Sequence, residues 1–409
     1  MLLIYNIGIS LYGFIIALLS PFNDKAQKLY KGRKDTQKRI KNLHLTEKTI
    51  WVHCASLGEF EQGRPIIEAI KSKNANTKVV LTFFSPSGYE VQKDYALADY
   101  VFYLPADRPA TVRRFVSAIN PEVAIFVKYE FWYHFLKHLH HQNIKTYIVS
   151  AIFRKQHAFF KWYGGWYRKM LTFFTMLYVQ DDKSAQLLSE INVHNYQVSG
   201  DTRFDRVYEI SQKAKEYPAL AEFAANSKVL VGGSTWPTGE DILVQYLLHN
   251  AEVKLLLAPH EIHEEHIKQI EEKLVGVTSA RYTQLEGVDL KSLRVLIVDT
   301  MGMLSSMYRY GHVAYIGGGF GSGIHNTIEA STFGLPVIFG PNYKKYQEAC
   351  DLVELNAGFV VESSFEFNKV ADDLLLNDDL LRSASKKAID YVDKMRGATE
   401  SIVAAIFEK

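Results

Sequence analysis

Short apolar runs rich in β-branched and aromatic residues alternate with amphipathic segments through most of the chain, and this alternation limits the folds available to it. Seven such runs lie between residues 49 and 200, and six more lie between residues 228 and 363. Alternation of this kind is typical of βαβ units, in which helices cover both faces of a parallel sheet. We therefore predict an α/β fold.

The apolar runs form two series, separated by a polar, helix-prone stretch from residue 201 to residue 227. A chain of 409 residues is long for one core, so two domains are expected. We predict two Rossmann-like, doubly wound domains that face each other across a cleft. The predicted divisions are a membrane-associating segment (1–22), an N-terminal domain (23–206), a C-terminal domain (207–385) and a C-terminal helix (386–409).

Composition excludes some classes of protein. The formal net charge of +2 is smaller than a nucleic-acid-binding protein usually carries, so no nucleic-acid partner is expected. Two cysteines, Cys54 and Cys350, cannot build a disulfide framework, which favours a reducing compartment.

The N-terminus departs from the average composition. Residues 2–20 carry no charge and approach the ~20 residues that a helix needs to cross a bilayer. No basic residue precedes them, unlike in a signal peptide, whereas Lys25, Lys28, Lys31 and Arg33 follow. This order favours membrane attachment with the remaining chain in the cytoplasm. A buried helix is the alternative, and spanning the bilayer or lying in one leaflet stays open.

Three charged residues follow predicted strands of the first series. Glu59 ends the corner "SLGE", where it is either a general base or, with Ser56, part of a helix-capping box. Glu130 lies among aromatic residues after the fourth strand, where it either serves the site or starts a helix. Arg203 follows a glycine turn and is either an anion ligand or half of an ordinary interdomain ion pair.

The second series offers candidate anion and sugar ligands. Ser234 and Thr235 follow a glycine corner that suits either an anion or a helix cap. The loop after "HVAYI" holds five glycines and matches neither the dinucleotide fingerprint nor a P-loop. Asn326 and Thr327 then open a helix, and Glu329 could bind ribose hydroxyls. Three further residues, His260, His263 and His266, are spaced by three, which favours a solvated helix face over a metal site.

These motifs together resemble the bacterial Kdo transferases, where Kdo is 3-deoxy-D-manno-octulosonic acid. The motifs "SLGE", "EFW", "SGDTRFD", "GSTWPTGE", "VDTMGML" and "HNTIEASTFGLPVIFGP" occur in the family's order over nearly the whole chain. The resemblance implies a GT-B fold, with an acceptor domain followed by a nucleotide-donor domain. It implies an inverting transferase that moves Kdo from CMP-Kdo to the lipid A precursor at the cytoplasmic face of the inner membrane, without cofactor or metal.

The resemblance also implies roles for particular residues. Glu59 would be the general base, and Glu130 and Arg203 would assist the transition state. The implied nucleotide-binding set is Ser234, Thr235, Pro259, His260, Met301, Gly302, Met303, Gly319, Gly321, His325, Asn326, Thr327, Ile328 and Glu329.

Four positions depart from the family pattern. The chain has "APHE" where Pro-Arg-His is usual, so a cation near the nucleotide phosphate is missing there. Met303 and Lys128 stand where acids are common, and Arg203 replaces the commoner lysine. The alternatives are another GT-B glycosyltransferase or a sugar-nucleotide epimerase with a different donor, a dehydrogenase, and a non-catalytic membrane-tethered binding module. The missing dinucleotide fingerprint argues against the dehydrogenase.

Overall fold

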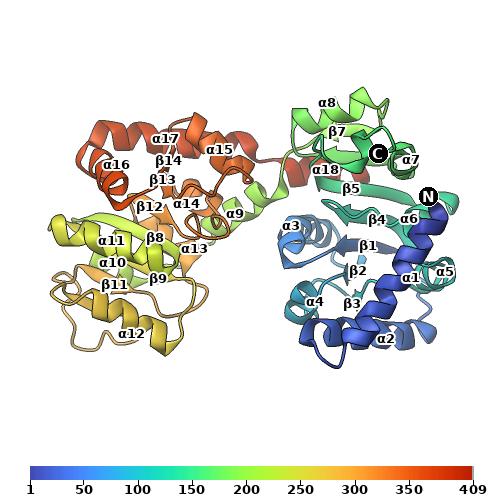
Figure 1. Cartoon of the computed structure of the whole chain (residues 1–409), viewed down its shortest axis with the longest axis horizontal. Coiled ribbons are helices and arrows are strands. Elements are labelled where there is room, and N and C mark those ends of the chain that lie inside the picture. Colours follow the sequence, from blue (N-terminus) through green and yellow to red (C-terminus); the bar gives the residue numbers. More distant parts are fainter. Residues whose placement is uncertain (408–409) are drawn as a thin grey trace. The chain divides into compact units, whose positions relative to one another are not determined.

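A computed structural model describes residues 1–407 and divides the chain into two units. Unit 1 comprises Met1–Arg206 together with the residues from Arg396 onward, and unit 2 comprises Val207–Met395. Each unit contains a parallel sheet with its own hydrophobic core (Figure 1). The prediction of two parallel-sheet α/β domains is therefore confirmed.

The sheet of unit 1 has the strand order β3-β2-β1-β4-β5-β6-β7, and its pairings are parallel. The strands are β1 (Thr49–Cys54), β2 (Lys78–Phe83), β3 (Tyr100–Tyr103), β4 (Pro121–Val127), β5 (Lys145–Ala151), β6 (Met176–Val179) and β7 (Tyr196–Val198). The order reverses between β1 and β4, and ligands of doubly wound sheets usually bind at such a reversal.

Both faces of this sheet are covered because successive side chains of a strand point to opposite faces. Trp51 belongs to one core, whereas Ile50 and Val52 belong to the other. The helices of unit 1 are α1 (Leu2–Leu19), α2 (Asp24–Lys41), α3 (Leu57–Lys73), α4 (Pro86–Gln92), α5 (Pro109–Ile119), α6 (Tyr133–His141), α7 (Gly165–Leu171), α8 (Asp182–Glu190) and α18 (Ala398–Phe407). Helices α3 and α18 cover the Ile50 face, and α5 and α6 cover the Trp51 face.

Unit 2 repeats the plan with the order β10-β11-β9-β8-β12-β13-β14. Its strands are β8 (Lys228–Thr235), β9 (Val253–Pro259), β10 (Ser279–Arg281), β11 (Val295–Ile297), β12 (Val313–Ile316), β13 (Val337–Phe339) and β14 (Gly358–Val360). Its helices are α10 (Pro218–Ala224), α11 (Pro237–His249), α12 (Glu264–Lys273), α13 (Leu304–Met307), α14 (Ile328–Thr332), α15 (Gln347–Glu354), α16 (Ser364–Leu376) and α17 (Asp378–Met395). Helix α9 (Thr202–Gln212) carries the chain from unit 1 into unit 2.

The predicted C-terminal helix from 386 to 409 is wrong as a single element. The structure has α17 and α18 instead, interrupted at Gly397, whose φ of +99° favours glycine. Asp205 accepts hydrogen bonds from the backbone N–H groups of Gly397 and Thr399 at 2.6 and 2.7 Å, and so caps α18. Because α18 packs on unit 1, unit 2 extends to residue 395 and not only to residue 385.

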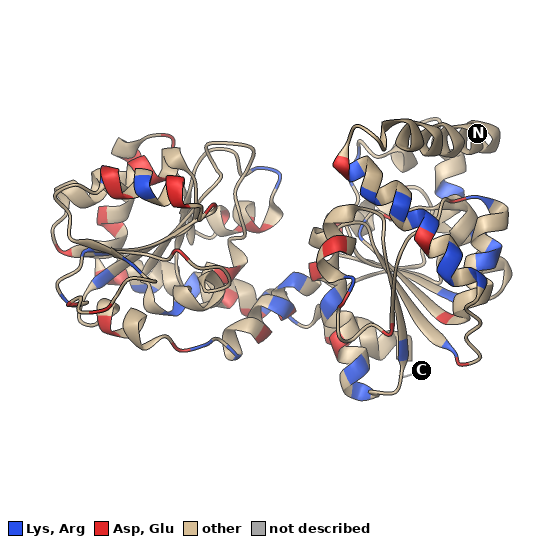
Figure 2. Cartoon of the chain, turned by 90° about the horizontal axis from the view of Figure 1, so that it is seen from below, with Lys and Arg blue, Asp and Glu red and all other residues tan. Residues whose placement is uncertain are grey.

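Helix α1 is long and apolar enough to cross a membrane, and it carries no Lys, Arg, Asp or Glu (Figure 2). Half-buried positions recur along one face, at Tyr5, Asn6, Ile9 and Gly13. The opposite face exposes large apolar side chains, which are Leu3, Ile4, Ile7, Leu11, Phe14, Ile15 and Leu18. The next helix, α2, is rich in lysine and arginine. Helix α1 therefore lies along unit 1 by one face and leaves an apolar stripe uncovered.

Candidate functional site

Glu59 lies at the carboxyl end of β1, in the first turn of α3. The capping alternative is not the arrangement that the side chains adopt. Ser56 precedes the helix, makes no side-chain bond to a backbone amide, and donates its hydroxyl proton to Glu59 Oε2. Helix α3 approaches the sheet closely because Gly63 has no side chain, and a Cβ there would lie 2.9 Å from Cys54 Sγ. The half-buried Glu59 carboxylate is thus held at the strand end by a neutral donor.

Glu59 and Glu130 follow two neighbouring strands, and a buried thiol lies near both. Cys54 is the last residue of β1, and burial raises the pKa of its thiol well above the ordinary value. The negative charges of Glu59 and Glu130 raise that pKa further, because each disfavours a nearby thiolate. Glu130 follows β4, the neighbour of β1 in the sheet. The structure therefore brings the two predicted carboxylates to one sheet edge.

Glu130 is bound from two sides, and its side chain is 12% exposed. Trp132 Nε1 donates to Glu130 Oε2 at 2.6 Å, and His53 Nε2 lies 2.8 Å from the same oxygen. His53 belongs to β1 and is completely buried. Glu130 is not part of the following helix, which begins at Tyr133, so the helix-start alternative does not apply.

Arg203 stands near the start of α9 and is paired within unit 1. Its Nε and Nη2 atoms each lie 2.8 Å from Asp201 Oδ2. Burial alone would raise the pKa of the Asp201 carboxyl, but the charge of Arg203 and hydrogen bonds from Arg203 and Gln62 bring it below the ordinary value. The ion pair that the structure shows for Arg203 is therefore local, two residues away in the sequence.

Unit 2 has a cavity of about 550 Å³ at the carboxyl ends of β8, β9 and β12. Three stacked rings line this cavity. The ring of His260 lies between those of Trp236 and His325, with its centroid 4.7 Å from the first and 4.5 Å from the second. Trp236 Nε1 donates to His325 Nε2 at 3.0 Å. Burial and the neighbouring His260 lower the pKa of His325, which favours the neutral form of this ring. No lysine or arginine is among the described residues that line the cavity.

The glycines of the loop that follows β12 have different surroundings. Gly321 lines the cavity, and a Cβ there would meet no atom closer than 3.6 Å. Gly319 packs against the backbone of Gly340, which would lie 2.5 Å from a Cβ. Gly317 is the tightest of these positions, since a Cβ would lie 1.9 Å from the carbonyl oxygen of Ser234. Of the predicted glycines, Gly321 is therefore open to a ligand, whereas Gly319 is required for packing.

The other predicted nucleotide ligands lie around the same strand ends. Asn326 donates from Nδ2 to Glu329 Oε1 at 3.0 Å, and its Oδ1 accepts the N–H of Ile328. The Ile328 side chain and Thr327 are buried, and Thr327 Oγ1 has no hydrogen-bond partner among residues 1–407.

Two further groups from the predicted set have contrasting surroundings. Thr235 is buried and donates to Glu240 Oε1 at 3.1 Å, while Ser234 has a positive φ of +48°. Pro259 ends β9 and is followed by His260, whose N–H donates to the Thr235 carbonyl at 2.9 Å. In the turn after β11, Met301 is 78% exposed, Gly302 has a φ of +82°, and Met303 is buried.

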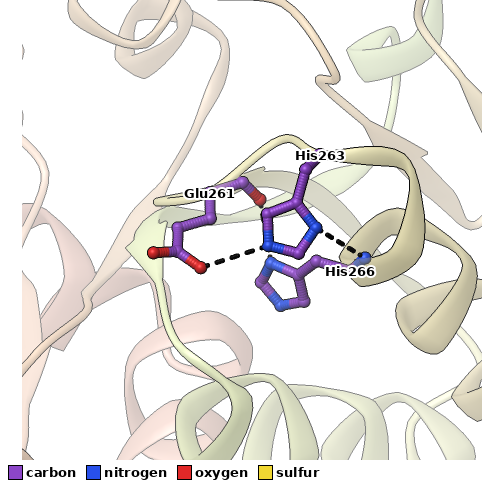
Figure 3. Close-up of side chains that lie close together, drawn as sticks. All are labelled: Glu261, His263 and His266. Atoms are coloured by element: carbon purple, nitrogen blue, oxygen red, sulfur yellow. Dashed lines mark hydrogen bonds and ion pairs between the residues drawn. The ribbon is translucent and has the colours of Figure 1, made fainter.

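The predicted histidine triplet separates in the structure. His260 joins the ring stack, whereas His263 and His266 lie beside Glu261, with one possible ligand atom of each residue within 4.8 Å of the others (Figure 3). His266 is buried, which contradicts the prediction of a solvated face at that position.

Hydrogen bonds occupy both histidines of this cluster. His266 Nδ1 donates to the carbonyl oxygen of Glu261 at 2.8 Å, and His266 Nε2 faces the buried Glu240 carboxyl at 3.0 Å. His263 Nδ1 accepts the backbone N–H of His266 and so caps α12, leaving the proton of a neutral ring on Nε2, 3.3 Å from Glu261 Oε2. Neither ring has an uncommitted lone pair, so a metal would have to displace these bonds.

Sequence reasoning did not identify His53, Trp132 and Trp236 as parts of the site. His53 and Trp132 lie within the quoted motifs or next to them, but a buried strand histidine and an aromatic residue are equally typical of a core. For His53 and Trp236 the connecting signal is spatial, because each binds a carboxylate or ring from another element, whereas Trp132 binds Glu130 of its own segment.

Sequence comparison relates the chain to known enzymes. Residues 27–206 match a family model described as 3-deoxy-D-manno-octulosonic-acid transferase (kdotransferase). The 3-deoxy-D-manno-octulosonic acid transferase of Aquifex aeolicus is 27% identical over 358 residues, covering 85% of this chain and 92% of that enzyme. The enzyme of the same name from Chlamydia trachomatis serovar A is 25% identical over 361 residues, covering 84% and 80%.

Structural comparison supports the fold. The UDP-GlcNAc 2-epimerase from Neisseria meningitidis, solved with UDP-GlcNAc, has a TM-score of 0.63 at 17% identity and covers 89% of this chain and 100% of that one. An identity this low shows a shared fold alone. The predicted GT-B-like architecture, with two Rossmann-like domains, is thus confirmed. The predicted resemblance to the Kdo transferases is supported separately, by the family model and the two enzymes of similar sequence.

Proposed function

We propose that this protein, a relative of the Kdo transferases over most of its length, transfers Kdo from CMP-Kdo to a sugar hydroxyl of a lipid A precursor. The observation that carries the proposal is sequence similarity over 85% of the chain to an enzyme named for this transfer. The carboxylate pair at the corner of β1 and β4 supports it, because such a reaction needs a base close to an acceptor hydroxyl.

Glu59 is the proposed general base. A hydroxyl is a weak nucleophile at neutral pH, and a carboxylate that accepts its proton during attack accelerates the reaction. The oxygen of the acceptor forms a bond to the anomeric carbon of Kdo, the bond from that carbon to the phosphate oxygen breaks, and CMP leaves. A single displacement of this kind inverts the anomeric configuration. Glu130 and Arg203 are the proposed assisting groups.

Unit 2 is the proposed site of the nucleotide. Its 550 Å³ cavity offers stacked rings, bare glycine backbone and the neighbouring Asn326 and Glu329, which suit a base, a phosphate and ribose hydroxyls respectively. The proposed chemistry requires no metal or cofactor, since protein carboxylates and backbone donors serve the acid–base and charge-stabilising roles.

The exposed stripe of α1 is the proposed membrane contact, through which the protein reaches a lipid acceptor. The polar face of the helix is bound to unit 1 at its start. Tyr5 donates to the buried Asp107, and His134 Nε2 donates to Asn6 Oδ1 at 2.6 Å. Further along, Tyr12 stacks on Phe84. A helix held along one face fits a position parallel to the membrane, with its apolar stripe in one leaflet and the lysines of α2 near anionic headgroups.

The test is transfer from CMP-Kdo to a lipid A precursor by the wild type and by Glu59→Gln, with folding checked by circular dichroism. We expect transfer by the wild type and a loss of ~100-fold or more in the variant. Ser56→Ala is the matched control, because it removes the hydrogen bond to Glu59 but keeps the carboxylate. Equal rates for wild type and Glu59→Gln would remove Glu59 from the mechanism.

UDP-sugars supplied in place of CMP-Kdo distinguish the alternatives. Transfer from a UDP-sugar would identify another GT-B glycosyltransferase, and interconversion of the sugar without an acceptor would identify an epimerase. A binding module would retain nucleotide affinity and show no turnover with any donor.

A further inference from the structure

We propose that His53 is a positioning residue for the Glu130 carboxylate, at the end of a buried series of hydrogen bonds across the sheet of unit 1. The proposal rests on the proposed function, in which Glu130 assists transfer. His53 itself is completely buried in β1 and contacts no solvent, so it acts through Glu130 and not on a substrate.

Glu130 has one engaged oxygen and one available oxygen. Oε2 receives Trp132 Nε1–H at 2.6 Å and lies 2.8 Å from His53 Nε2. Oε1 accepts no hydrogen bond from residues 1–407, and the side chain is 12% exposed. Two ring N–H groups on one oxygen fix the plane of the carboxylate and leave Oε1 for a ligand.

The protons at the two ends of the series can be assigned. Trp51 Nε1–H donates to Thr82 Oγ1 at 2.9 Å, since an indole nitrogen can only donate. His53 Nδ1 lies 2.9 Å from Thr82 Oγ1 and 3.1 Å from the Thr82 carbonyl oxygen, so Nδ1 has a partner there with or without a proton. The partner of Nε2 is a carboxylate oxygen, which accepts, so Nε2 carries a proton and donates it to Glu130. The contacts thus run from Trp51 through Thr82 and His53 to Glu130.

The surroundings keep this series rigid. Trp51 lies 5.2 to 5.4 Å from the rings of Phe115, Phe126 and Phe135, and His53 meets Phe126 edge-on at 5.7 Å. Two neighbouring strands supply the anchor, because Trp51 and His53 are in β1 and Thr82 is in β2, while Glu130 lies in the segment after β4, on the other side of β1. A carboxylate on an irregular segment is thereby fixed from the interior of the sheet, where positions vary least.

The kinetic test uses His53→Leu, which removes the donor, and His53→Gln, whose amide N–H can replace it. For His53→Leu we expect kcat to fall by about 10- to 100-fold, the cost of a misplaced catalytic group, with KM for CMP-Kdo little changed. His53→Gln should recover much of the loss. Phe115→Leu is the control for a weakened core, since it stands beside Trp51 but loses no hydrogen bond, and its kcat should stay near that of the wild type.

Combining His53→Leu with Glu130→Gln separates positioning from a general structural effect. If His53 acts through Glu130, the double variant should be about as slow as Glu130→Gln alone, because the two changes remove one interaction. Losses that multiply, or a loss in Phe115→Leu as large as in His53→Leu, would overturn the proposal.

A spectroscopic test does not depend on turnover. The full chain labelled with ¹⁵N in its histidine rings should show His53 protonated at Nε2, with its resonances assigned by their disappearance in His53→Gln. Glu130→Gln should shift the Nε2 resonance. An Nε2 without a proton, or no response to Glu130→Gln, would overturn the positioning role even in an active enzyme. Absence of Kdo transfer by the wild type would instead overturn the proposed function and leave this arrangement to be judged by its spectrum.

Discussion

At the scale of single residues, the ion pair between Asp201 and Arg203 stabilises unit 1 in a way that depends on pH. The side chain of Asp201 is 5% exposed and that of Arg203 is 30% exposed, so solvent screens the pair only in part. The pKa of Asp201 is lower in the folded protein than in the unfolded chain. The stabilisation that follows is therefore complete above the unfolded pKa of about 3.9 and is lost as pH falls through the lower, folded pKa.

We predict that Asp201→Asn lowers the free energy of unfolding by about 2 kcal/mol at pH 7, the usual contribution of hydrogen bonds to a charged group. The difference from wild type should persist down to about pH 4 and shrink below it. Urea unfolding of the wild type and of Asp201→Asn between about pH 3 and pH 7 measures this difference in the free energy of unfolding. Subtracting the two free energies at each pH removes the contribution of the other carboxyl groups, which both proteins share. A gap that widens on acidification would contradict the prediction.

Chelation tests the histidine cluster of unit 2. Because hydrogen bonds occupy His263 and His266, we predict that dialysis against EDTA changes neither Kdo transfer nor stability. His263→Ala should instead cost about 1 kcal/mol through the lost cap of α12. Activity that falls on chelation and returns with added zinc would show that a metal displaces these bonds.

The residues of the site were predictable to different degrees. Glu59, Glu130 and the glycine loop each follow an apolar run. A parallel sheet places the residues that follow its strands at one edge of that sheet, so the sequence alone indicated these positions in each unit. The partners of these residues could not be predicted in the same way. One alternative had Ser56 bind a backbone amide as a helix cap, whereas Ser56 binds Glu59 instead, a choice between partners that spacing cannot resolve. His53 meets Glu130 across 77 residues of sequence.

At the scale of helices and strands, the face by which α1 rests on unit 1 has a measurable topological consequence. If α1 lies in one leaflet, both of its ends are on the same side of the membrane, which is the cytoplasmic side in the proposed arrangement. We predict that a cysteine appended before Met1 and the variant Pro21→Cys react equally with an impermeant maleimide in inside-out vesicles, and that neither reacts in right-side-out vesicles. Lys41→Cys, at the end of α2, is the reference for the side on which the rest of the chain lies.

These variants need a background without the partly exposed Cys350, whereas Cys54 is buried. Labelling of the two ends from opposite sides of the membrane would establish a spanning helix and contradict the contacts of Tyr5 and Asn6 with unit 1.

Elements with a strong local pattern were predicted well, and elements that depend on distant partners were not. The apolar runs correspond to thirteen strands of the described structure, whereas the three residues of β10 have no apolar run and pair only because β11 lies beside them. The break before α18 depends on Asp205, which lies almost 200 residues earlier in the sequence. A local reading of 386–409 meets one glycine, Gly397, among helix-forming residues and joins the two helices across it.

At the scale of the whole molecule, the two separate cores predict separable stabilities. Ile402 of α18 is completely buried in unit 1, so Ile402→Ala should lower the stability of that unit by about 2 to 5 kcal/mol. Unit 2 should be unaffected. Ile389→Ala is the matched control, because Ile389 in α17 is 42% exposed.

Tryptophan fluorescence can report on one unit at a time. Trp51, Trp132, Trp162 and Trp166 are in unit 1, and Trp236 is in unit 2. In a Trp236→Phe background, the urea midpoint followed by fluorescence therefore reports unit 1 and should fall in Ile402→Ala. An equal fall in Ile389→Ala, or none in Ile402→Ala, would contradict the assignment of α18 to the core of unit 1.

The return of α18 to unit 1 also sets an order for folding on the ribosome. Domains generally fold as they emerge, beginning with the N-terminal one. Here the first unit lacks Ile402, Val403 and Ile406 until nearly the whole chain has been made, whereas the segment for unit 2 is complete earlier. The sheet that carries Glu59 and Glu130 is thus finished last. A truncated nascent chain would hold a folded unit 2 and a unit 1 with one face of its sheet only partly covered, a state that calls for protection by chaperones.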